Sequence, residues 1–509
     1  MSIREEADLV ILGAGFAGAV MALTSQRLGL RPVLVEKGRH PRFAIGESST
    51  PITNLVLEDL ARTYDLPRLL PLTKYGRWQA TYPHLACGLK RGFTFVRHEA
   101  GRPFTPRPDH ANELLVAASP RDEIADTHWF REHFDHFVVE EVKAAGIPYY
   151  DQTEVTALEQ RDGWRVRANR LGREMHIAAP FLVDATGPSG LLPRVLGIDA
   201  SPAAVRTNSW SVFSHFVDVG LWQDVLLEQG GSITDHPYPC DYAALHHVLD
   251  DGWVWVLRFN NGVTSAGVMY DGEVRPPPSP GVSLRTPGFE DSPQGLEPEA
   301  EWAALLARYP SLGRQFARAR PVQPWVCTGR VQRKVRRAAG DNWAMLAHAA
   351  YFLDPLFSSG NAHSLLTVER LTRILAPHWG RSAMKVELAE YSATLLREVD
   401  FIDRLIYGCY RSFGRFDLMA AFTMYYFAGA IHSEEQHRAG LAGERDEFLS
   451  SHHPPFRAAF ARGYERLLEV GCPVKGYERQ VARDIGPINT AGLCDPAKKN
   501  MYPFASPSQ

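Results

Sequence analysis

Cysteine is scarce in this sequence of 509 residues. The six cysteines lie far apart, and no two of them form a CxxC pair. This spacing argues against a disulfide framework and against a cysteine-based zinc module, and it fits a protein of the reducing cytosol. We therefore predict free thiols at all six positions, which are Cys87, Cys240, Cys327, Cys409, Cys472 and Cys494.

An excess of one charge is also absent, because 55 basic residues balance 58 acidic residues. This balance removes the global electrostatic argument for a nucleic acid or an anionic membrane as a partner.

Long apolar runs are missing as well. The uncharged stretch 9–26 contains glycines and follows Glu5, Glu6 and Asp8, which argues against a signal peptide and a membrane span. We predict a soluble, cytoplasmic protein of roughly two or three domains.

The most informative segment is residues 8–20, DLVILGAGFAGAV. An apolar strand rich in β-branched residues meets a glycine turn, and helix-forming residues follow. In this geometry Gly13 makes the turn, Gly15 lets the backbone approach a pyrophosphate, and Gly18 lets the helix pack on the strand. The pattern predicts an α/β protein with a doubly wound, Rossmann-like nucleotide-binding domain.

An acidic residue follows at the spacing that this motif requires. Glu36 closes a second strand, 32–36, where a carboxylate accepts two ribose hydroxyls and would repel a 2′-phosphate. The loop 37–51 is long, and such loops beside a nucleotide-binding strand are usually functional. The alternative is an ordinary surface loop whose Ser and Thr residues cap the next helix.

A related arrangement occurs twice more along the chain. The strand 180–184 ends at Asp184 and runs into a turn with Gly187 and Gly190, where an open α/β sheet binds ligands. Residues 340–360 predict another strand and loop, with a helix from about Asn361, so the chain returns to the nucleotide-binding sheet.

Other segments have the character of antiparallel sheets and of helices. Residues 154–167 alternate like a hairpin, and residues 207–272 have the aromatic and β-branched composition of an antiparallel sheet, with Asn261-Gly262 as a turn. Residues 273–298 are rich in proline and predict a loop or lid. Helical spacing dominates after Val368. The aromatic run 422–427 within it is more typical of a helix core than of a substrate-cavity wall.

Histidines give no convincing metal site. Residues 126–142 fit an amphipathic helix capped by Asp126 or Thr127. His133 and His136 within it have the spacing of two metal ligands, but no third ligand follows, so solvated or core histidines are the better interpretation. We predict no metal.

Residues 78–98 predict strands around a turn, in which Lys90 lies between Gly88 and Gly92. Glycine lets a backbone come close to something large and flat. A lysine in a turn is nevertheless more often a solvated charge, and composition alone does not decide between the two readings.

Taken together, the glycine turn with Glu36, the strand ending at Asp184 and the pair Gly340-Asp341 resemble FAD-dependent enzymes of the p-hydroxybenzoate hydroxylase type. More narrowly, four segments resemble flavin-dependent halogenases, through about three quarters of the chain. These segments are Gly46-Glu47-Ser48, CGLKRGFTF (87–95), GWVW (252–255) and FLDPLFSSG (352–360).

This resemblance implies a function. In that family reduced FAD, oxygen and halide give hypohalous acid, which travels to a lysine near the substrate. Lys90 takes the lysine's place, as a hydrogen-bond donor or, when neutral, as a haloamine-forming nucleophile. The backbone N–H groups of Ser359 and Gly360 match the family's halide position. The residues implied to bind FAD are Gly13, Gly15, Gly18, Glu36, Lys37, Glu47, Ser48, Arg131, Asp184, Gly187 and Asp341.

Two of the family's motifs are altered here. Its Trp-x-Trp-x-Ile-Pro signature stands as Trp253-Val-Trp255-Val-Leu257-Arg258, so the last two positions differ and an arginine replaces the proline. The glutamate of the tryptophan-specific branch is Phe357 here, as in the branch that acts on phenols and pyrroles. An electron-rich phenol or pyrrole activates its own ring, so no dedicated base is required.

The predicted domains are an FAD-binding domain (1–205 and 325–375, with inserted strands near 78–98), a substrate-facing antiparallel sheet with a lid (206–324) and a helical C-terminal region (376–509). The partners would be a small aromatic substrate, free or tethered to a carrier, and a separate flavin reductase, since no second GxGxxG occurs. An FAD-dependent aromatic monooxygenase is the nearest alternative function, and a non-catalytic flavin-binding protein is a third.

Overall fold

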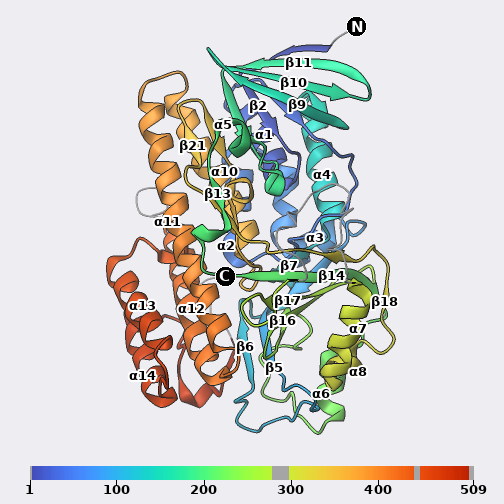
Figure 1. Cartoon of the computed structure of the whole chain (residues 1–509), viewed down its shortest axis with the longest axis vertical. Coiled ribbons are helices and arrows are strands. Elements are labelled where there is room, and N and C mark those ends of the chain that lie inside the picture. Colours follow the sequence, from blue (N-terminus) through green and yellow to red (C-terminus); the bar gives the residue numbers. More distant parts are fainter. Residues whose placement is uncertain (1–2, 278–296, 441–447, 504–509) are drawn as a thin grey trace.

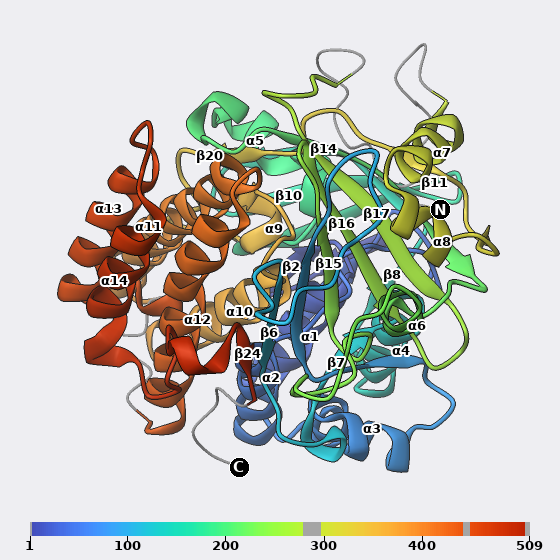
Figure 2. The ribbon, with the colours of Figure 1, turned by 90° about the horizontal axis from the view of Figure 1, so that it is seen from below.

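The computed structural model describes residues 3–277, 297–440 and 448–503. A small sheet beside the N-terminus forms one end of the molecule, and a parallel sheet flanked by helices follows it (Figure 1). A large sheet forms the other end, and the C-terminal helices run along one side of both (Figures 1 and 2). The predicted combination of an α/β domain, an antiparallel sheet and a helical C-terminal region is confirmed.

The parallel sheet contains the predicted strand, turn and helix of residues 8–20. Six strands lie in the order β21 (Ala339–Gly340), β22 (Trp343–Met345), β12 (Phe181–Asp184), β2 (Leu9–Leu12), β3 (Pro32–Val35) and β8 (Tyr149–Tyr150). All neighbours run parallel except β21 and β22. Every residue of β2, β3 and β12 is buried, which explains their unbroken apolar character.

Helices cover this sheet, and several smaller elements surround it. The long ones are α1 (Phe16–Arg27), α2 (Pro51–Thr63), α4 (Arg131–Ala144) and α10 (Ser359–His378). A capping box starts α2, in which the Thr50 N–H donates to Thr53 Oγ1 over 3.0 Å. The shorter elements are α3 (Tyr75–Thr81), α5 (Leu191–Leu196), α9 (Ala347–Ala350) and the strands β13 (Ala200–Ser201), β20 (Arg333–Val335) and β23 (Tyr351–Phe352).

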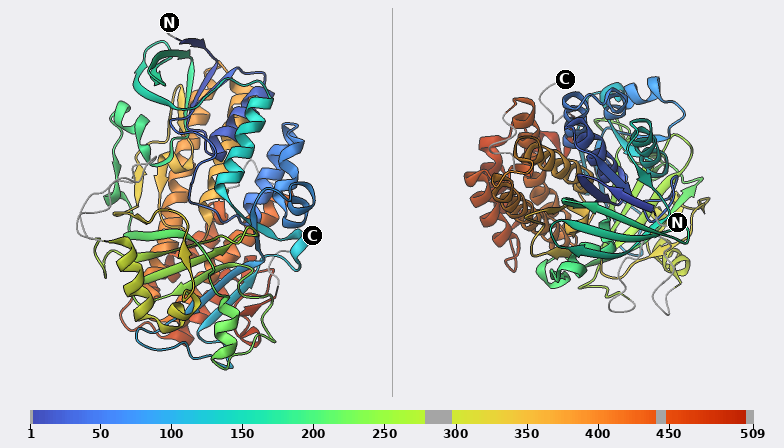
Figure 3. Two further views of the ribbon diagram at one scale, coloured as in Figure 1. Left: turned by 90° about the vertical axis from the view of Figure 1, so that its right-hand side faces the viewer. Right: turned by 90° about the horizontal axis from the view of Figure 1, so that it is seen from above.

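The N-terminal sheet confirms the hairpin predicted for residues 154–167. It consists of β1 (Ile3–Glu6), β11 (Arg173–Ala179), β10 (Trp164–Arg170) and β9 (Thr153–Gln160), and β9 and β10 pair antiparallel. Figure 3 shows this sheet crossing the end of the molecule where the N-terminus lies.

The large sheet has nine strands and confirms the antiparallel prediction for residues 207–272. Gly262, with φ of +83°, lies in the turn between the paired strands β16 and β17. The sheet also contains β5 and β6, so one strand of the segment 78–98, β5, belongs to this sheet, whereas the strand Cys87–Lys90 lies in a separate two-stranded sheet. Its strands are β5 (Gly92–Arg97), β6 (Glu113–Ala117), β14 (Ser209–Val217), β15 (Ala244–Val248), β16 (Gly252–Arg258), β17 (Thr264–Asp271), β18 (Arg320–Pro321), β19 (Val326–Cys327) and β24 (Met501–Tyr502).

The two faces of this sheet pack into different cores. Successive side chains of a strand point to opposite faces, so Trp253, Trp255 and Leu257 face the nucleotide-binding half while Val254 and Val256 face away. The outer face carries α6 (Trp222–Glu228), α7 (Pro298–Arg308) and α8 (Pro310–Gln315).

The C-terminal helices pack against α10 and α2 as part of the main core. They are α11 (Ala383–Ser412), α12 (Phe416–Arg438), α13 (Pro454–Leu467) and α14 (Val474–Ile485), and Figure 2 shows them side by side. Among the described helices, none combines the length and the apolar character needed to cross a membrane.

Two local predictions were wrong. The segment 126–129 is a strand, β7 (Asp126–Trp129), and the helix begins at Arg131. The reason is tertiary: β7 pairs antiparallel with β4 (Cys87–Lys90), and this ladder overrides the helical spacing. Lys90 therefore ends a strand opposite Asp126 and does not lie in a turn. Most of the predicted loop or lid, 278–296, falls outside the described residues.

Candidate active site

A cavity of about 860 Å³ lies between the parallel sheet and the inner face of the large sheet. Leu12, Glu36 and Ala185, which stand at or just past the carboxyl ends of β2, β3 and β12, form part of its lining. This is where an open α/β sheet binds its ligand. The cavity extends to aromatic residues of the large sheet, so the parallel sheet and the large sheet face one shared space.

The three glycines of the turn differ in the space around them. Gly13 has φ of +98°, and a Cβ there would lie 2.4 Å from the Ala185 carbonyl oxygen. A Cβ on Gly18 would lie 2.0 Å from the Gly13 carbonyl oxygen. Gly15 differs. The atoms nearest to a Cβ built there would be Arg131 Nη2 and Asp135 Oδ2, both 3.9 Å away, and Gly15 lines the cavity. Gly13 and Gly18 therefore serve backbone packing, and Gly15 leaves room for a ligand.

Glu36 presents its carboxylate to the cavity. Its oxygens accept hydrogen bonds from the N–H groups of Ala14 and Gly38, both over 2.8 Å, and Arg42 lies 3.6 Å away. A carboxylate has about four lone-pair sites, so acceptor capacity remains for ribose hydroxyls. Lys37 stands at the rim, 56% exposed, and pairs with Glu154 over 2.9 Å.

Arg131 holds the loop that contains Glu47 and Ser48. Its guanidinium donates to Asp135 in a bidentate pair of 2.7 and 2.8 Å and to the carbonyl oxygens of Ile45 and Gly46 over 2.9 and 3.0 Å. The structure thus ties α4 to the cavity-lining loop, and Arg131 itself lines the cavity.

Two polar groups on this loop are buried without a hydrogen-bond partner among the described residues. Glu47 accepts from the Nε2 of His215 over 2.8 Å through one carboxylate oxygen, and its other oxygen is unpartnered. The hydroxyl of Ser48 and the amide oxygen of Asn361 are likewise unpartnered. All three residues line the cavity, so these groups fit a polar ligand in it.

Asp184 shapes the cavity without lining it. Its carboxylate accepts from the N–H and Oγ1 of Thr186 over 2.9 and 2.7 Å and from the N–H of Leu192 over 3.3 Å. Burial raises its pKa, and these hydrogen bonds oppose that shift. The loop that it organises does line the cavity, including Gly187 at φ of +60°.

Asp341 lies away from the cavity. It precedes β22 and therefore stands at the amino end of that strand, where its exposed carboxylate pairs with Lys385 over 2.6 Å. Ligands of an open α/β sheet bind at the opposite, carboxyl end. There the chain presents Leu346 and His348, which line the cavity. The motif was thus assigned to the wrong end of the strand.

His348 and Arg333 are cavity residues that the sequence reasoning missed. Burial lowers the pKa of His348 to about 3, with contributions from Arg131 and Arg333, so its ring is neutral. Arg333 donates to the carbonyl oxygens of His348 and Ala349 and holds this turn in place. A signal for His348 was present, since it follows the strand 343–345 at its carboxyl end.

The N-terminus of α10 opens into the cavity. Ser358 has φ of +52°, and Ser359 and Gly360 line the cavity at the first turn of this 20-residue helix. First-turn N–H groups have no partner within their own helix, so they are available to an anion. A Cβ on Gly360 would lie 2.6 Å from His348 Nε2, which explains why glycine stands at this contact.

Lys90 is fully buried and does not itself line the large cavity, but its amine contacts Ser49, the residue next to cavity-lining Ser48. Its Nζ donates to the Ser49 carbonyl oxygen over 2.5 Å and lies 4.1 Å from the centroid of the Phe93 ring. Burial lowers the pKa of Lys90 from 10.5 to about 7, and the carboxylate of Asp126 opposes the shift. Lys90 is therefore not the solvated lysine of the alternative reading.

Residues near Lys90 line two separate cavities. Ser48 and His246 line the large one, and His246 stacks on Phe93 with ring centroids 5.9 Å apart. Phe93 and Tyr426 line a second cavity of about 40 Å³. The two glycines beside Lys90 serve close backbone contacts: a Cβ on Gly88 would lie 1.9 Å from the Arg258 carbonyl oxygen.

The arginine that departs from the Trp-x-Trp-x-Ile-Pro signature has a structural role outside the cavity. Arg258 pairs with Asp241 over 3.3 Å and donates to the carbonyl oxygens of Val219 and Gly220. Asp241 in turn accepts from the first N–H groups of α6. Arg258 thus fastens α6, while Trp253, Trp255 and Leu257 of the same strand line the cavity.

Comparison with known proteins gives a consistent picture. A family model described as FAD dependent oxidoreductase matches residues 8–327. The monodechloroaminopyrrolnitrin halogenase PrnC of Pseudomonas fluorescens is 27% identical over 98% of this chain and 86% of that protein. The tetracycline 7-halogenase of Kitasatospora aureofaciens is 28% identical over 81% and 71%. The structure of the halogenase PltM in complex with phloroglucinol and FAD has a TM-score of 0.84, 22% identity and coverage of 98% and 100%, which shows a shared fold.

Proposed function

Because the chain belongs to the family of FAD-dependent oxidoreductases, we propose that it is a flavin-dependent halogenase that acts on an electron-rich aromatic substrate of the phenol or pyrrole type. The observation that carries this proposal is a fully buried lysine whose amine donates to the carbonyl oxygen of Ser49, the residue next to cavity-lining Ser48. The named relatives support it, since PrnC and the tetracycline 7-halogenase are halogenases and the solved PltM structure contains phloroglucinol with FAD.

The residues around the cavity have separate tasks in this proposal. The glycine turn receives the pyrophosphate of FAD, Glu36 receives the ribose, and Arg131 fixes the loop of Glu47 and Ser48. Reduced FAD, when bound, supplies with oxygen the two-electron oxidation of halide to hypohalous acid.

The N-terminus of α10 holds the halide. The N–H groups of Ser359 and Gly360 point their partial positive charge toward the cavity, and the helix dipole adds to it. His348 beside Gly360 is neutral, so the backbone N–H groups and the helix dipole supply the positive potential at this position.

Lys90 directs the oxidant to the substrate. Its amine has lost most of its preference for the protonated form, so it can donate a hydrogen bond to hypohalous acid. Alternatively, the neutral amine attacks the halogen: an N–halogen bond forms as the O–halogen bond breaks, and the displaced hydroxide takes a proton from the amine and leaves as water. Both roles need a nitrogen at this position.

The identity of the product tests the proposal. The full chain is supplied with FAD, a flavin reductase, chloride or bromide, and a panel of phenols, pyrroles and carrier-tethered pyrroles. The last group is included because one relative is a chlorinase of a pyrrole held on a peptidyl-carrier protein. We expect halide isotope patterns that disappear when halide is omitted. Incorporation of label from ¹⁸O₂ without halogen would instead assign an aromatic monooxygenase.

The pH dependence distinguishes the two roles of Lys90. If the neutral amine attacks halogen, product formation rises as the pH increases through about 7, because Lys90 loses its proton there. We expect this acidic limb, measured as initial product rate at saturating reduced FAD. The pH of this limb should be the same with chloride and with bromide, because the pKa of Lys90 does not depend on the halide. A limb set by the hypohalous acid would shift, because hypochlorous and hypobromous acids differ in acidity. A rate that falls with pH would assign hydrogen bonding by the protonated amine.

A separate flavin reductase is the expected partner. The sequence contains one GxGxxG, and the cavity that it lines is assigned to FAD. We therefore expect the isolated chain to oxidise NADH and NADPH no faster than free FAD does, and product to form only when a reductase is added. Rapid NADPH oxidation by the isolated chain, coupled to product, would contradict this.

The six cysteines are all free thiols, which supports the proposed cytoplasmic location.

A further inference from the structure

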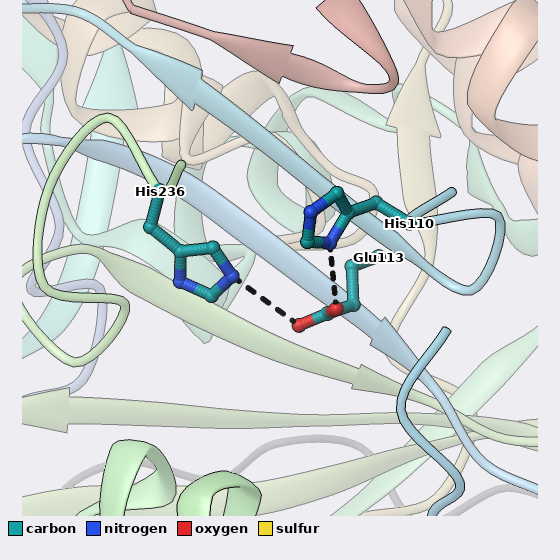
Figure 4. A group of neighbouring side chains, drawn as sticks. All are labelled: His110, Glu113 and His236. Carbon is teal, nitrogen blue, oxygen red and sulfur yellow. Dashed lines mark hydrogen bonds and ion pairs between the residues drawn. The ribbon is translucent and has the colours of Figure 1, made fainter. Parts of the chain in front are cut away.

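Two histidines and a glutamate meet at the edge of the large sheet, apart from the cavity (Figure 4). His110 precedes β6 and has φ of +50°, and Glu113 is the first residue of that strand. His236 comes from the loop between α6 and β15. Figure 4 shows the three side chains pointing toward one another, and we call them the His110 cluster.

The cluster is buried, and its polar atoms are poorly matched to one another. The side chains of His110, Glu113 and His236 are 6%, 2% and 1% exposed. Both nitrogens of His110 face carboxylates, Nδ1 at 3.1 Å from Glu113 and Nε2 at 2.8 Å from Asp235. Neither ring nitrogen of His236 makes a hydrogen bond within the described residues. A buried imidazole without a partner is costly, so a missing ligand is indicated.

We propose that the His110 cluster binds one zinc ion. Two imidazoles and a carboxylate form a donor set that zinc uses, whereas calcium and magnesium prefer oxygen alone. Ligand atoms of a tetrahedral zinc ion lie roughly 3.3 Å apart. The Nδ1 of His110 lies 3.1 Å from Glu113 Oε2 and the Nε2 of His236 lies 3.7 Å from Glu113 Oε1, and one ligand atom from each residue can be chosen so that all lie within 4.8 Å of one another.

Asp235 has the position of an orienting partner. Asp235 accepts a hydrogen bond from the Nε2–H of His110, which leaves the Nδ1 lone pair for the metal. This is the usual arrangement around zinc-bound histidines. This assignment accounts for a histidine that otherwise faces two carboxylates at once. A water molecule would complete four-coordination.

The site would fasten three segments of the chain. The metal ligands come from the loop 229–243 and from the start of β6. The third segment is β24, near the C-terminus, which pairs with β6. Asn500 reinforces this junction, because its Nδ2 donates to the His110 carbonyl oxygen over 3.1 Å and its own carbonyl oxygen accepts from Leu115. The metal would therefore be structural, and its effect is a gain in stability.

Metal binding by the full chain tests this proposal independently of halogenation. Protein treated with a chelator and then dialysed is titrated with Zn²⁺ by calorimetry, and with Co²⁺ as a visible probe. We expect one equivalent of zinc with a Kd below about 1 µM, a four-coordinate Co²⁺ absorption spectrum, and a higher Tm with zinc. His236→Asn should weaken binding more than about 100-fold, and Asp235→Asn about 10- to 100-fold.

The control is His176→Asn, which removes an exposed histidine paired with Glu174 over 3.2 Å and should leave binding unchanged. Absence of zinc binding by the folded wild-type chain would overturn the proposal. So would equal affinity in His236→Asn, or binding lost in His437→Asn, which belongs to a second group with Asp59 and Glu369. If His236→Asn does not fold, Asp235→Asn and the Co²⁺ spectrum of the wild type decide.

Discussion

Replacing Lys90 with alanine should abolish the halogenated product while oxygen consumption with reduced FAD continues. Residues assigned to the cofactor line the large cavity, whereas Lys90, the last residue of β4, does not line it, so the two steps are separable. We expect a loss of more than about 10⁴-fold in product, above the 10²- to 10⁴-fold typical of removing a general acid or base. Product by mass spectrometry and oxygen uptake by electrode, in the same reaction, measure the two steps.

Conservative variants separate chemistry from packing. Lys90→Met keeps the buried stem without nitrogen and should be as inactive as Lys90→Ala. Lys90→Arg should also fail, because a guanidinium stays protonated and cannot act as a nucleophile, although it donates hydrogen bonds. The matched control is Lys74→Met, since Lys74 also acts electrostatically on Asp126 and should be dispensable.

The outcomes discriminate between the roles of Lys90. Normal halogenation by Lys90→Arg would exclude the haloamine and leave hydrogen bonding. Normal halogenation by both Lys90→Ala and Lys90→Met would remove Lys90 from the reaction, and the monooxygenase would become the better assignment.

Local patterns predicted the parts of the fold in which neighbouring residues determine structure. The segment 8–20 is one example, because a buried strand, a turn with positive φ and a helix each leave a local signature. The hairpin at Gly262 is another. The strand Asp126–Trp129 was missed because its partner, Cys87–Lys90, lies about 40 residues away in sequence, and only the folded chain brings the ladder together.

The site was predictable where one segment carries several of its groups. Gly15 and Glu36 stand at fixed distances from their strands, and both line the cavity. Arg333 was not predictable from the sequence. It lines the cavity and donates to the carbonyl oxygen of His348, and no sequence motif marks such a contact. Asp341 shows a different error. The motif lies beside a strand of the parallel sheet, as predicted, but Asp341 stands at the amino end of that strand, away from the cavity, and pairs with Lys385.

The His110 cluster shows the same limit for ligands distant in sequence. The prediction of no metal depended on short spacings such as that between His133 and His136. Those two histidines serve other contacts, because His133 Nδ1 accepts from the Ala86 N–H and His136 faces Glu140. His110 and His236 lie far apart in sequence, with β6 and β14 of the nine-stranded sheet between them, and they meet only in the folded chain.

Replacing Gly15 with valine should abolish FAD binding and leave the fold intact. A Cβ at Gly15 meets nothing nearer than 3.9 Å, and the backbone there has φ of −65°, which any residue adopts. The added side chain therefore fits the protein but fills the space for the pyrophosphate. We expect FAD affinity to fall by about 10³-fold, equivalent to roughly 4 kcal/mol, with Gly15→Ala in between, measured by fluorescence titration and with Tm as the folding check.

Two further glycine variants make this result specific. Gly13→Ala should destabilise the fold itself, because its Cβ would lie 2.4 Å from the Ala185 carbonyl oxygen at φ of +98°. Gly414→Val, where a Cβ meets nothing within 4 Å, should change neither FAD affinity nor Tm. If Gly15→Val keeps full FAD affinity, the pyrophosphate does not pass over this turn, and the assignment of the cavity to FAD fails with it. If its Tm falls as far as that of Gly13→Ala, Gly15 is a packing residue and the open space in front of it is not the ligand's.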